Sequence, residues 1–122
     1  MLHGLLRTAA ATAVDRWLFA PGQSLHAPHL LDLEVAQVLR RHASSGGLDA
    51  DRCRAALSAM AEFPLTRHPH HLLLPRIWQL RHNLSAYDAA YVALAEVLDA
   101  PLLTADRRIA TAPGHRARVE LV

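Results

Sequence analysis

The sequence predicts an α/β fold in which a parallel sheet is covered by helices on both faces. Short β-like runs alternate with amphipathic helical segments along the chain, a pattern typical of parallel strands joined by crossover helices. The 122 residues suit one domain with one core, and a hydrophobic content of 52% is ample for burying that core. We therefore expect residues 1–122 to form a single domain.

Helical periodicity dominates the first half of the chain. Apolar side chains recur at intervals of three and four residues, and clusters of Pro, Gly and Ser interrupt the pattern. Asp49 directly precedes one of these segments and is suited to cap its first turn. The expected elements are a helix over residues 5–19, an extended segment at 24–28, a helix over 29–42, a helix from Asp49 to Glu62 and a strand at 64–68.

The second half contains one strongly apolar helix and two short strand candidates. Ser85 is suited to begin that helix, and Pro101 marks the start of a buried strand. The expected elements are helical spacing over 69–80, a helix from Ser85 to near Asp99, a strand at 101–104, a helical turn at 106–112 and a closing strand at 117–122.

Composition excludes several classes of protein. No run approaches the 18 consecutive apolar residues of a membrane span, and charged or polar residues at His3, Arg7 and Asp15 interrupt the N-terminal stretch, unlike a signal peptide. The lone Cys53 excludes an internal disulfide and a cysteine-based zinc site. All thirteen basic residues are arginine, and the net charge is only +2. We expect a cytoplasmic protein that has no membrane partner.

Three acidic residues lie where a strand or loop candidate gives way to a helix. Glu34 and Asp106 follow strand candidates, and Asp88 lies in the first turn of the most apolar helix. In open α/β sheets the functional crevice lies beyond the carboxyl ends of the strands. Carboxylates gathered at that edge are the ligands that a hard divalent cation prefers.

Each of these acids also has an ordinary structural explanation. Ser85 and Asp88 have the spacing of a capping box, and Asp106 is a normal N-cap residue. Asp32 and Glu34 flank the apolar face of their helix on opposite edges, so periodicity cannot choose between them. Asp88, however, opens a helix that is apolar nearly all round, and we expect its carboxylate to be partly desolvated.

Aromatic and histidine residues are expected to have structural roles. The aromatic side chains recur within apolar helical faces, where core packing is the default. The histidines beside Pro69 have divergent directions in an extended backbone, which disfavours a shared metal ion. The aromatic residues concerned are Trp17, Trp78, Tyr87 and Tyr91, and the histidines, which we expect to begin a helix, are His68, His70 and His71.

Three segments together resemble the PIN-domain ribonucleases of the VapC toxin type. They are APHLLDLEVAQVLRR, LPRIWQLRHNLSAYDAAYVALAE and PLLTADRRIA, in this order, and the similarity covers nearly the whole chain. Glu34 matches the helix glutamate of the family, Asp88 the aspartate of its Y-D-A motif, and Thr104 and Asp106 its T-x-D motif. The resemblance implies a PIN-like three-layer α/β/α sandwich with a short, mostly parallel central sheet.

The resemblance also implies a function. Proteins of this type are metal-dependent endoribonuclease toxins of type II toxin–antitoxin pairs, hydrolases that use Mg²⁺ or Mn²⁺. Glu34, Asp88 and Asp106 are then the expected metal ligands and catalytic residues, Thr104 orients a ligand or water, and Arg41 or Arg107 steers the phosphate. The implied partners are a cognate VapB-type antitoxin, an RNA substrate and a second copy of the chain in a homodimer.

One departure from the family leaves alternatives open. The family begins with a short strand that ends in a metal-binding aspartate, whereas this sequence starts at Met1-Leu2-His3-Gly4, within the helix expected to follow that strand. A catalytically impaired PIN relative that binds antitoxin or RNA without cleavage is therefore the alternative function. A metal-dependent phosphohydrolase on the same architecture is a third possibility, because fold does not fix function.

Overall fold

A computed structural model describes residues 24–122 of the chain. The helix expected over residues 5–19, Trp17 and the expected loss of an N-terminal strand lie outside the described residues. The described elements follow the expected order, with strand and helix alternating. They are β1 (His26–Pro28), α2 (Leu30–Ser44), α3 (Ala50–Glu62), β2 (Thr66–His68), the 3₁₀ turn η1 (His71–Leu73), α4 (Leu74–Gln79), α5 (Ala86–Leu98), β3 (Leu102–Thr104), α6 (Arg107–Thr111) and β4 (Val119–Leu121).

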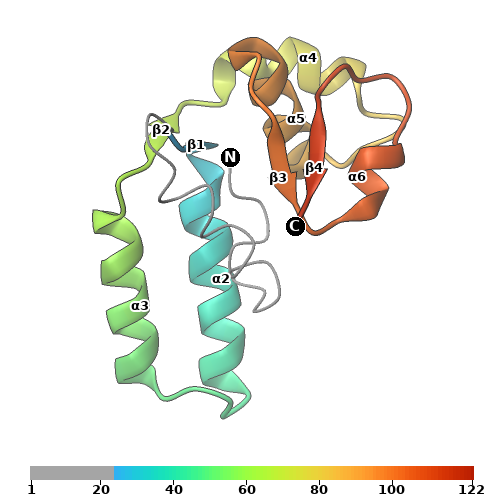
Figure 1. Cartoon of the computed structure of the whole chain (residues 1–122). Coiled ribbons are helices and arrows are strands. Elements are labelled where there is room, and N and C mark those ends of the chain that lie inside the picture. The colour runs from blue at the N-terminus through green and yellow to red at the C-terminus, as the bar shows by residue number, and fades with distance from the viewer. Residues whose placement is uncertain (1–23) are drawn as a thin grey trace.

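The four described strands form two parallel pairs. β1 pairs with β2 and β3 pairs with β4, with His26 opposite Thr66 and Leu102 opposite Val119. Each pair is closed by a helical crossover, α2 and α3 in the first and α6 in the second (Figure 1). The prediction of short parallel strands joined by helices is thus confirmed, and within the described residues the sheet is divided into two pairs.

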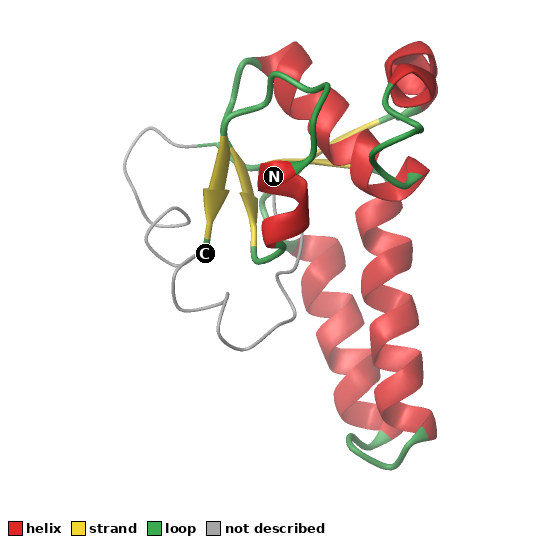
Figure 2. Ribbon diagram, turned by 90° about the vertical axis from the view of Figure 1, so that its right-hand side faces the viewer, coloured by secondary structure: helices red, strands yellow, loops and turns green. Residues whose placement is uncertain are grey.

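Helices α2 and α3 lie side by side and project away from the β3–β4 pair (Figure 2). Asp49 caps α3 as expected, because its side chain accepts a hydrogen bond of 2.8 Å from the Arg52 backbone N–H. The sulfur of Cys53 donates to the Leu39 carbonyl oxygen across the interface between the two helices. Leu39 and Cys53 belong to the same buried apolar cluster as the residues of α5.

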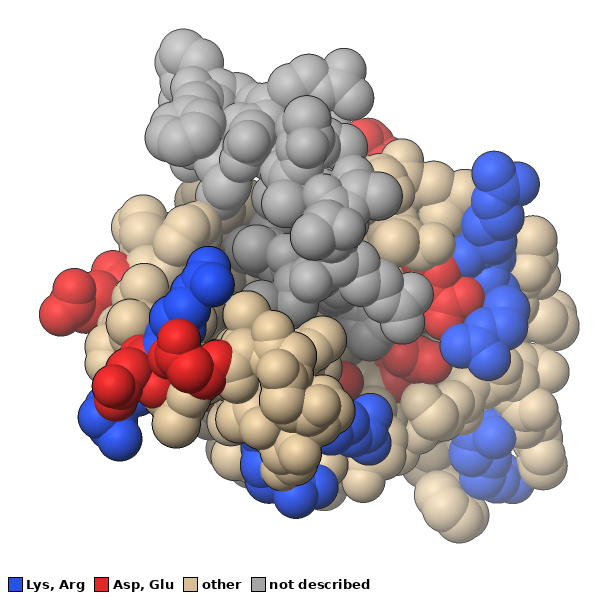
Figure 3. Space-filling model, turned by 90° about the horizontal axis from the view of Figure 1, so that it is seen from below, with Lys and Arg blue, Asp and Glu red and all other residues tan. Residues whose placement is uncertain are grey.

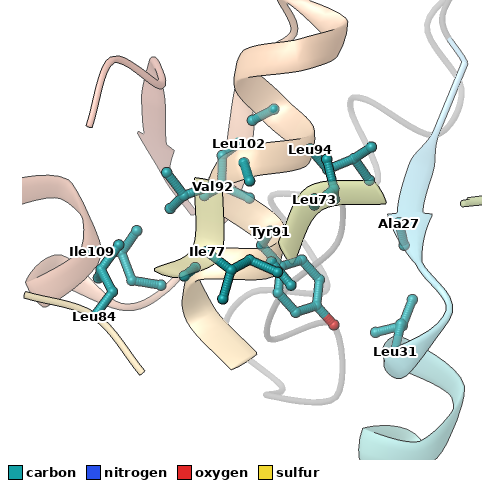
Figure 4. Packing of buried hydrophobic residues seen from close by; sticks show 14 of the residues in the cluster. Ala27, Leu31, Leu73, Ile77, Leu84, Tyr91, Val92, Leu94, Leu102 and Ile109 are labelled. Carbon is teal, nitrogen blue, oxygen red and sulfur yellow. The ribbon is translucent and has the colours of Figure 1, made fainter. Parts of the chain in front are cut away.

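Helix α5 forms the centre of the core. Its residues Ala89–Ala95 are all buried, and α5 packs against β1, β3 and α4 (Figure 4). The small side chains of this helix let the neighbouring backbones approach closely, while Tyr91 fills the space toward α2. Asp99 ends α5 in the left-handed conformation, with φ of 48°, which an aspartate tolerates better than most residues. The prediction of a helix that is apolar nearly all round is confirmed.

The helical spacing expected over residues 69–80 is divided into η1 and α4. Pro75 has no backbone N–H, so the ladder of hydrogen bonds cannot run through this position. The chain instead closes a tighter turn, in which the Leu73 N–H donates to the His70 carbonyl at 3.0 Å, and α4 starts with proline in its first turn. Of the three histidines expected at a helix start, only His71 lies within η1.

Two of the aromatic residues are not in the core. Tyr91 is fully buried as expected, but Trp78 and Tyr87 are each 67% exposed, so the prediction of core packing is wrong for these two. α4 is only six residues long and buries Ile77, which leaves Trp78 on its outer side. There the guanidinium of Arg81 lies 4.5 Å from the centre of the indole ring and covers part of it.

None of the helices in residues 24–122 combines the length and the apolar character that crossing a bilayer requires.

A pair of histidines joins β1 to β2. His26 Nδ1 lies 2.8 Å from His68 Nε2, and His26 Nε2 lies 2.8 Å from the Ser24 hydroxyl. The two facing nitrogens share one proton, which one ring donates and the other accepts. If both rings were protonated, two N–H groups and two positive charges would face each other. Burial, followed by the charge of His68, lowers the pKa of His26 below its ordinary value of 6.5.

Acidification is expected to destabilise the fold through this pair. Because the pKa of His26 is lower in the folded chain than in the unfolded chain, the unfolded state takes up the proton first as the pH falls. The stability that the neutral His26 ring contributes is therefore fully present above pH 6.5 and decreases as the pH falls below this value. Between about pH 7.5 and about pH 5.5, the melting temperature of the native protein should fall by a few degrees more than that of His26→Gln.

The exposed His82 provides a control, because His82→Gln removes a histidine outside the pair. This variant should retain the native pH dependence in the same thermal scans. If the melting temperatures of the native protein and His26→Gln fell equally with decreasing pH, the proposed effect of His26 would be contradicted.

Candidate active site

Glu34 faces the core helix and not the solvent. It lies in the second turn of α2, is half-buried, and accepts a short hydrogen bond from the Tyr91 hydroxyl of α5. Figure 4 shows the Tyr91 hydroxyl pointing from α5 toward the start of α2. On the other edge of the helix, Asp32 accepts a 2.7 Å hydrogen bond from Arg67 Nε. Tertiary packing therefore makes the choice between Asp32 and Glu34 that periodicity left open.

Tyr91 is a permanent hydrogen-bond donor at this site. Burial raises the pKa of its hydroxyl well above the usual range, and the hydrogen bond to Glu34 raises it further. The negative charges of Glu34, Asp88 and Asp32 act in the same direction. Glu34 is thereby held in one orientation by a group that stays protonated.

Asp88 lies in the first turn of α5, one helical turn before Tyr91. Its backbone N–H donates to the Ser85 hydroxyl at 3.1 Å, which is the N-cap bond expected from the sequence. The Asp88 side chain is half-buried, which confirms the expected partial desolvation. This cap involves only the backbone N–H of Asp88. The N-cap bond therefore does not explain why the side chain at this position is a carboxylate.

Asp106 and Thr104 form one local unit at the end of β3. Thr104 is fully buried, and its hydroxyl accepts a 3.1 Å hydrogen bond from the Asp106 backbone N–H. Asp106 then caps α6, where Oδ1 accepts the Arg108 backbone N–H at 2.9 Å. The Arg108 guanidinium also binds the carboxylate, with Nε 3.1 Å from Oδ1 and Nη2 2.8 Å from Oδ2.

Electrostatics link these three regions through Asp88. The hydrogen bond and charge of Asp106 raise the pKa of Arg108, and the charge of Asp88 adds to this effect. Asp88 also contributes to the raised pKa of Tyr91, the partner of Glu34. Asp88 thus acts on one group beside Glu34 and on another beside Asp106. In residues 24–122, however, no three His, Cys, Asp or Glu side chains stand close enough to hold a metal ion together.

The sequence profile of the PIN domain matches residues 2–114 of this chain. Ribonuclease VapC1 of Mycobacterium tuberculosis is 50% identical to it over 123 residues, which span 100% of this chain and 92% of that protein. The chain belongs to the VapC group of PIN-domain proteins. Ribonuclease VapC9 of the same organism is 51% identical over 87 residues, spanning 71% of this chain and 68% of that relative. Ribonuclease VapC12 is 36% identical over 118 residues, spanning 97% and 90%.

The PIN fold accounts for the arrangement of the predicted residues. Parallel strands direct their carboxyl ends toward one edge, so the ends of β3 and β4 lie together (Figure 1). Thr104 is the last residue of β3, and Asp106 follows two residues later. Figure 3 looks onto this face and shows acidic side chains lying directly beside arginines. The three-layer α/β/α class expected from the sequence is confirmed by the PIN match.

Two residues that contact the candidate acids were not predicted from the sequence. Tyr91 could have been found from its position one turn after Asp88, which places the two side chains on the same helix face. Arg108 follows the capping aspartate by two residues, and only the structure shows its guanidinium turned back onto Asp106. The two arginines that were considered, Arg41 and Arg107, are exposed, and neither is ion-paired with Asp106.

Proposed function

We propose that this chain is a metal-dependent endoribonuclease, the toxin of a type II toxin–antitoxin pair. The observation that carries the proposal is the 50% identity to a VapC ribonuclease over the full length of the chain. Two contacts support it, because Tyr91 of α5 donates to Glu34, and the charge of Asp88 acts both on Tyr91 and on Arg108, the partner of Asp106. Its expected reaction is hydrolysis of RNA phosphodiester bonds within the strand.

The donor atoms fit Mg²⁺ or Mn²⁺. All of them are oxygens, from the carboxylates of Glu34, Asp88 and Asp106 and the hydroxyl of Thr104. Mg²⁺ commonly binds through one or two carboxylates and retains water in its remaining positions, so three adjacent protein ligands are not required. Asp88 and Asp106 would hold the ion, and Glu34 would bind through water. When bound, the ion supplies Lewis acidity that offsets the charge developing on the scissile phosphate.

The residues of the chain would prepare this chemistry. Tyr91 fixes the orientation of Glu34 by donating its hydroxyl proton, and Thr104 fixes the turn that presents Asp106. Glu34 would accept a hydrogen bond from the attacking water and orient it toward phosphorus. The buried α5 provides a rigid base for Asp88, which limits reorganisation during the reaction.

Family membership supports the partners. A VapB-type antitoxin would silence the toxin, RNA would be the substrate, and two copies of the chain would form a homodimer. The proposed location is the cytoplasm, where the RNA substrate is found.

The second candidate is a PIN relative that binds RNA or antitoxin without cutting. A specific observation favours it, because the Arg108 guanidinium bonds both carboxylate oxygens of Asp106, one of the proposed metal ligands.

RNA cleavage with and without metal separates the two candidates. The chain should cut a mixed RNA pool internally in Mg²⁺ or Mn²⁺ and should be silent in EDTA. RNA binding measured by fluorescence anisotropy, without cleavage in either metal, would instead establish the second candidate. Hydrolysis of a small phosphate ester but not of RNA would point to a phosphohydrolase.

A further inference from the structure

Arg108 forms an ion pair with Asp106, the carboxylate that would bind the metal ion. Its guanidinium spans Asp106 with Nε 3.1 Å from Oδ1 and Nη2 2.8 Å from Oδ2. The Asp106 side chain is only 14% exposed, whereas the Arg108 side chain is 87% exposed. The anion is therefore held in place, and the cation can leave toward solvent without disturbing packed atoms.

The bidentate contact is specific to Arg108. Its Nε bonds Oδ1 of Asp106 and its Nη2 bonds Oδ2. The neighbouring Arg107 is also exposed but makes no ion pair with Asp106.

We propose that Arg108 is a resident counter-ion, which a divalent cation must displace from Asp106 and which then holds the phosphate of the RNA. This inference rests on the proposed function. Arg108 already donates three hydrogen bonds to the two oxygens of Asp106, which leaves one of the roughly four acceptor sites of the carboxylate. A divalent cation at that remaining site would lie beside the guanidinium, and the repulsion between the two cations favours release of the Arg108 side chain. A guanidinium released beside the site can bind a phosphate with two hydrogen bonds. Arg108 is in this sense a positioning residue that couples metal binding to substrate binding.

Metal affinity in the absence of RNA tests the displacement directly. Mn²⁺ binding to the full chain, measured by electron paramagnetic resonance of the free ion, should tighten about threefold to fivefold in Arg108→Ala. Arg107→Ala removes the same charge from the adjacent position, and its Mn²⁺ affinity should stay close to native. Arg108→Lys should fall between the two, because lysine keeps the charge but cannot span both oxygens.

Substrate binding tests the second step. At saturating Mn²⁺, Arg108→Ala should raise KM for single-stranded RNA several-fold with little change in kcat, whereas Arg52→Ala, which removes an exposed arginine of α3, should change neither. The melting temperatures of both variants should match the native protein, because the Asp106 cap uses the Arg108 backbone. A purely structural role for Arg108 would lower the melting temperature and leave Mn²⁺ affinity unchanged.

The outcomes separate this inference from the proposed function. Equal Mn²⁺ affinities in the native protein, Arg108→Ala and Arg107→Ala would overturn the role of Arg108 and leave metal-dependent cleavage standing. Absence of Mn²⁺ binding in all three would overturn the metal dependence itself, and the counter-ion role with it.

Discussion

Replacing Asp88 by asparagine is expected to reduce metal-dependent RNA cleavage by at least about a hundredfold while the fold remains intact. A metal-bound carboxylate supports several kcal/mol of transition-state stabilisation, and about 2.7 kcal/mol corresponds to a hundredfold change in rate. Asparagine keeps the shape of the side chain but lacks the charge. The cap of α5 survives, because Ser85 accepts from the backbone N–H of residue 88. Initial cleavage rates and thermal melts of the two proteins provide the measurement.

Asp51→Asn is the matched control for this variant. Asp51 also lies in the first turn of a helix, α3, but its side chain is 89% exposed and forms an ion pair with Arg54 of the same helix. Both substitutions remove a favourable interaction with the helix dipole, worth about 0.3–1 kcal/mol. Cleavage by Asp51→Asn should therefore equal native cleavage. If Asp88→Asn retained the native rate, the assignment of Asp88 as a metal ligand would be wrong.

Replacing Glu96 by alanine is expected to lower the free energy of unfolding by about 3 kcal/mol. The Glu96 side chain is 6% exposed and accepts from Arg76 Nε at 2.8 Å and from Arg76 Nη2 at 2.9 Å. It also accepts the Arg116 backbone N–H at 2.7 Å, which ties α5 to the segment before β4. Truncation leaves the half-buried Arg76 without its carboxylate partner, although its bonds to Gln79 Oε1 and the Gly114 carbonyl remain. Urea denaturation at neutral pH gives the change in free energy directly.

An exposed ion pair and a pH series provide the controls. Arg54→Ala removes a partner from a pair that is 76% and 89% exposed, and it should cost less than about 1 kcal/mol. The hydrogen bond from Arg76 holds the pKa of Glu96 below its ordinary value of 4.5. The stabilisation is therefore fully present above pH 4.5 and is lost as the pH falls through the lower folded pKa. The difference in the free energy of unfolding between the native protein and Glu96→Gln should decrease as the pH falls below 4.5. A difference that does not change with pH would contradict this prediction.

Local signals in the sequence identified the helix starts and the candidate acids that lie beside them. Asp49, Ser85 and Asp106 all cap helices, because a cap depends on residues two or three positions away. The expected burial of the helix after Ser85 also holds, since no other packing suits an all-round apolar surface.

Features that depend on contacts between distant segments could not be predicted from the sequence. Asp32 and Glu34 lie on opposite edges of α2 and cannot be distinguished from the sequence. Only the tertiary structure shows that Arg67 binds the first and Tyr91 the second. Trp78 lies in an apolar pattern, yet a six-residue helix buries only one side. Arg108 looks like any solvated arginine until its side chain is seen turned back onto Asp106.

The position of α5 between the two strand pairs makes the site cooperative. α5 packs against β1 on one side and β3 on the other, and it carries Asp88 and the tyrosine that holds Glu34. Glu34 belongs to the half of the chain that contains β1, and Asp106 to the half that contains β3. Neither half carries the three acids by itself. Partial unfolding of either half would therefore separate the three candidate acids, and the proposed catalysis would require both halves to be folded.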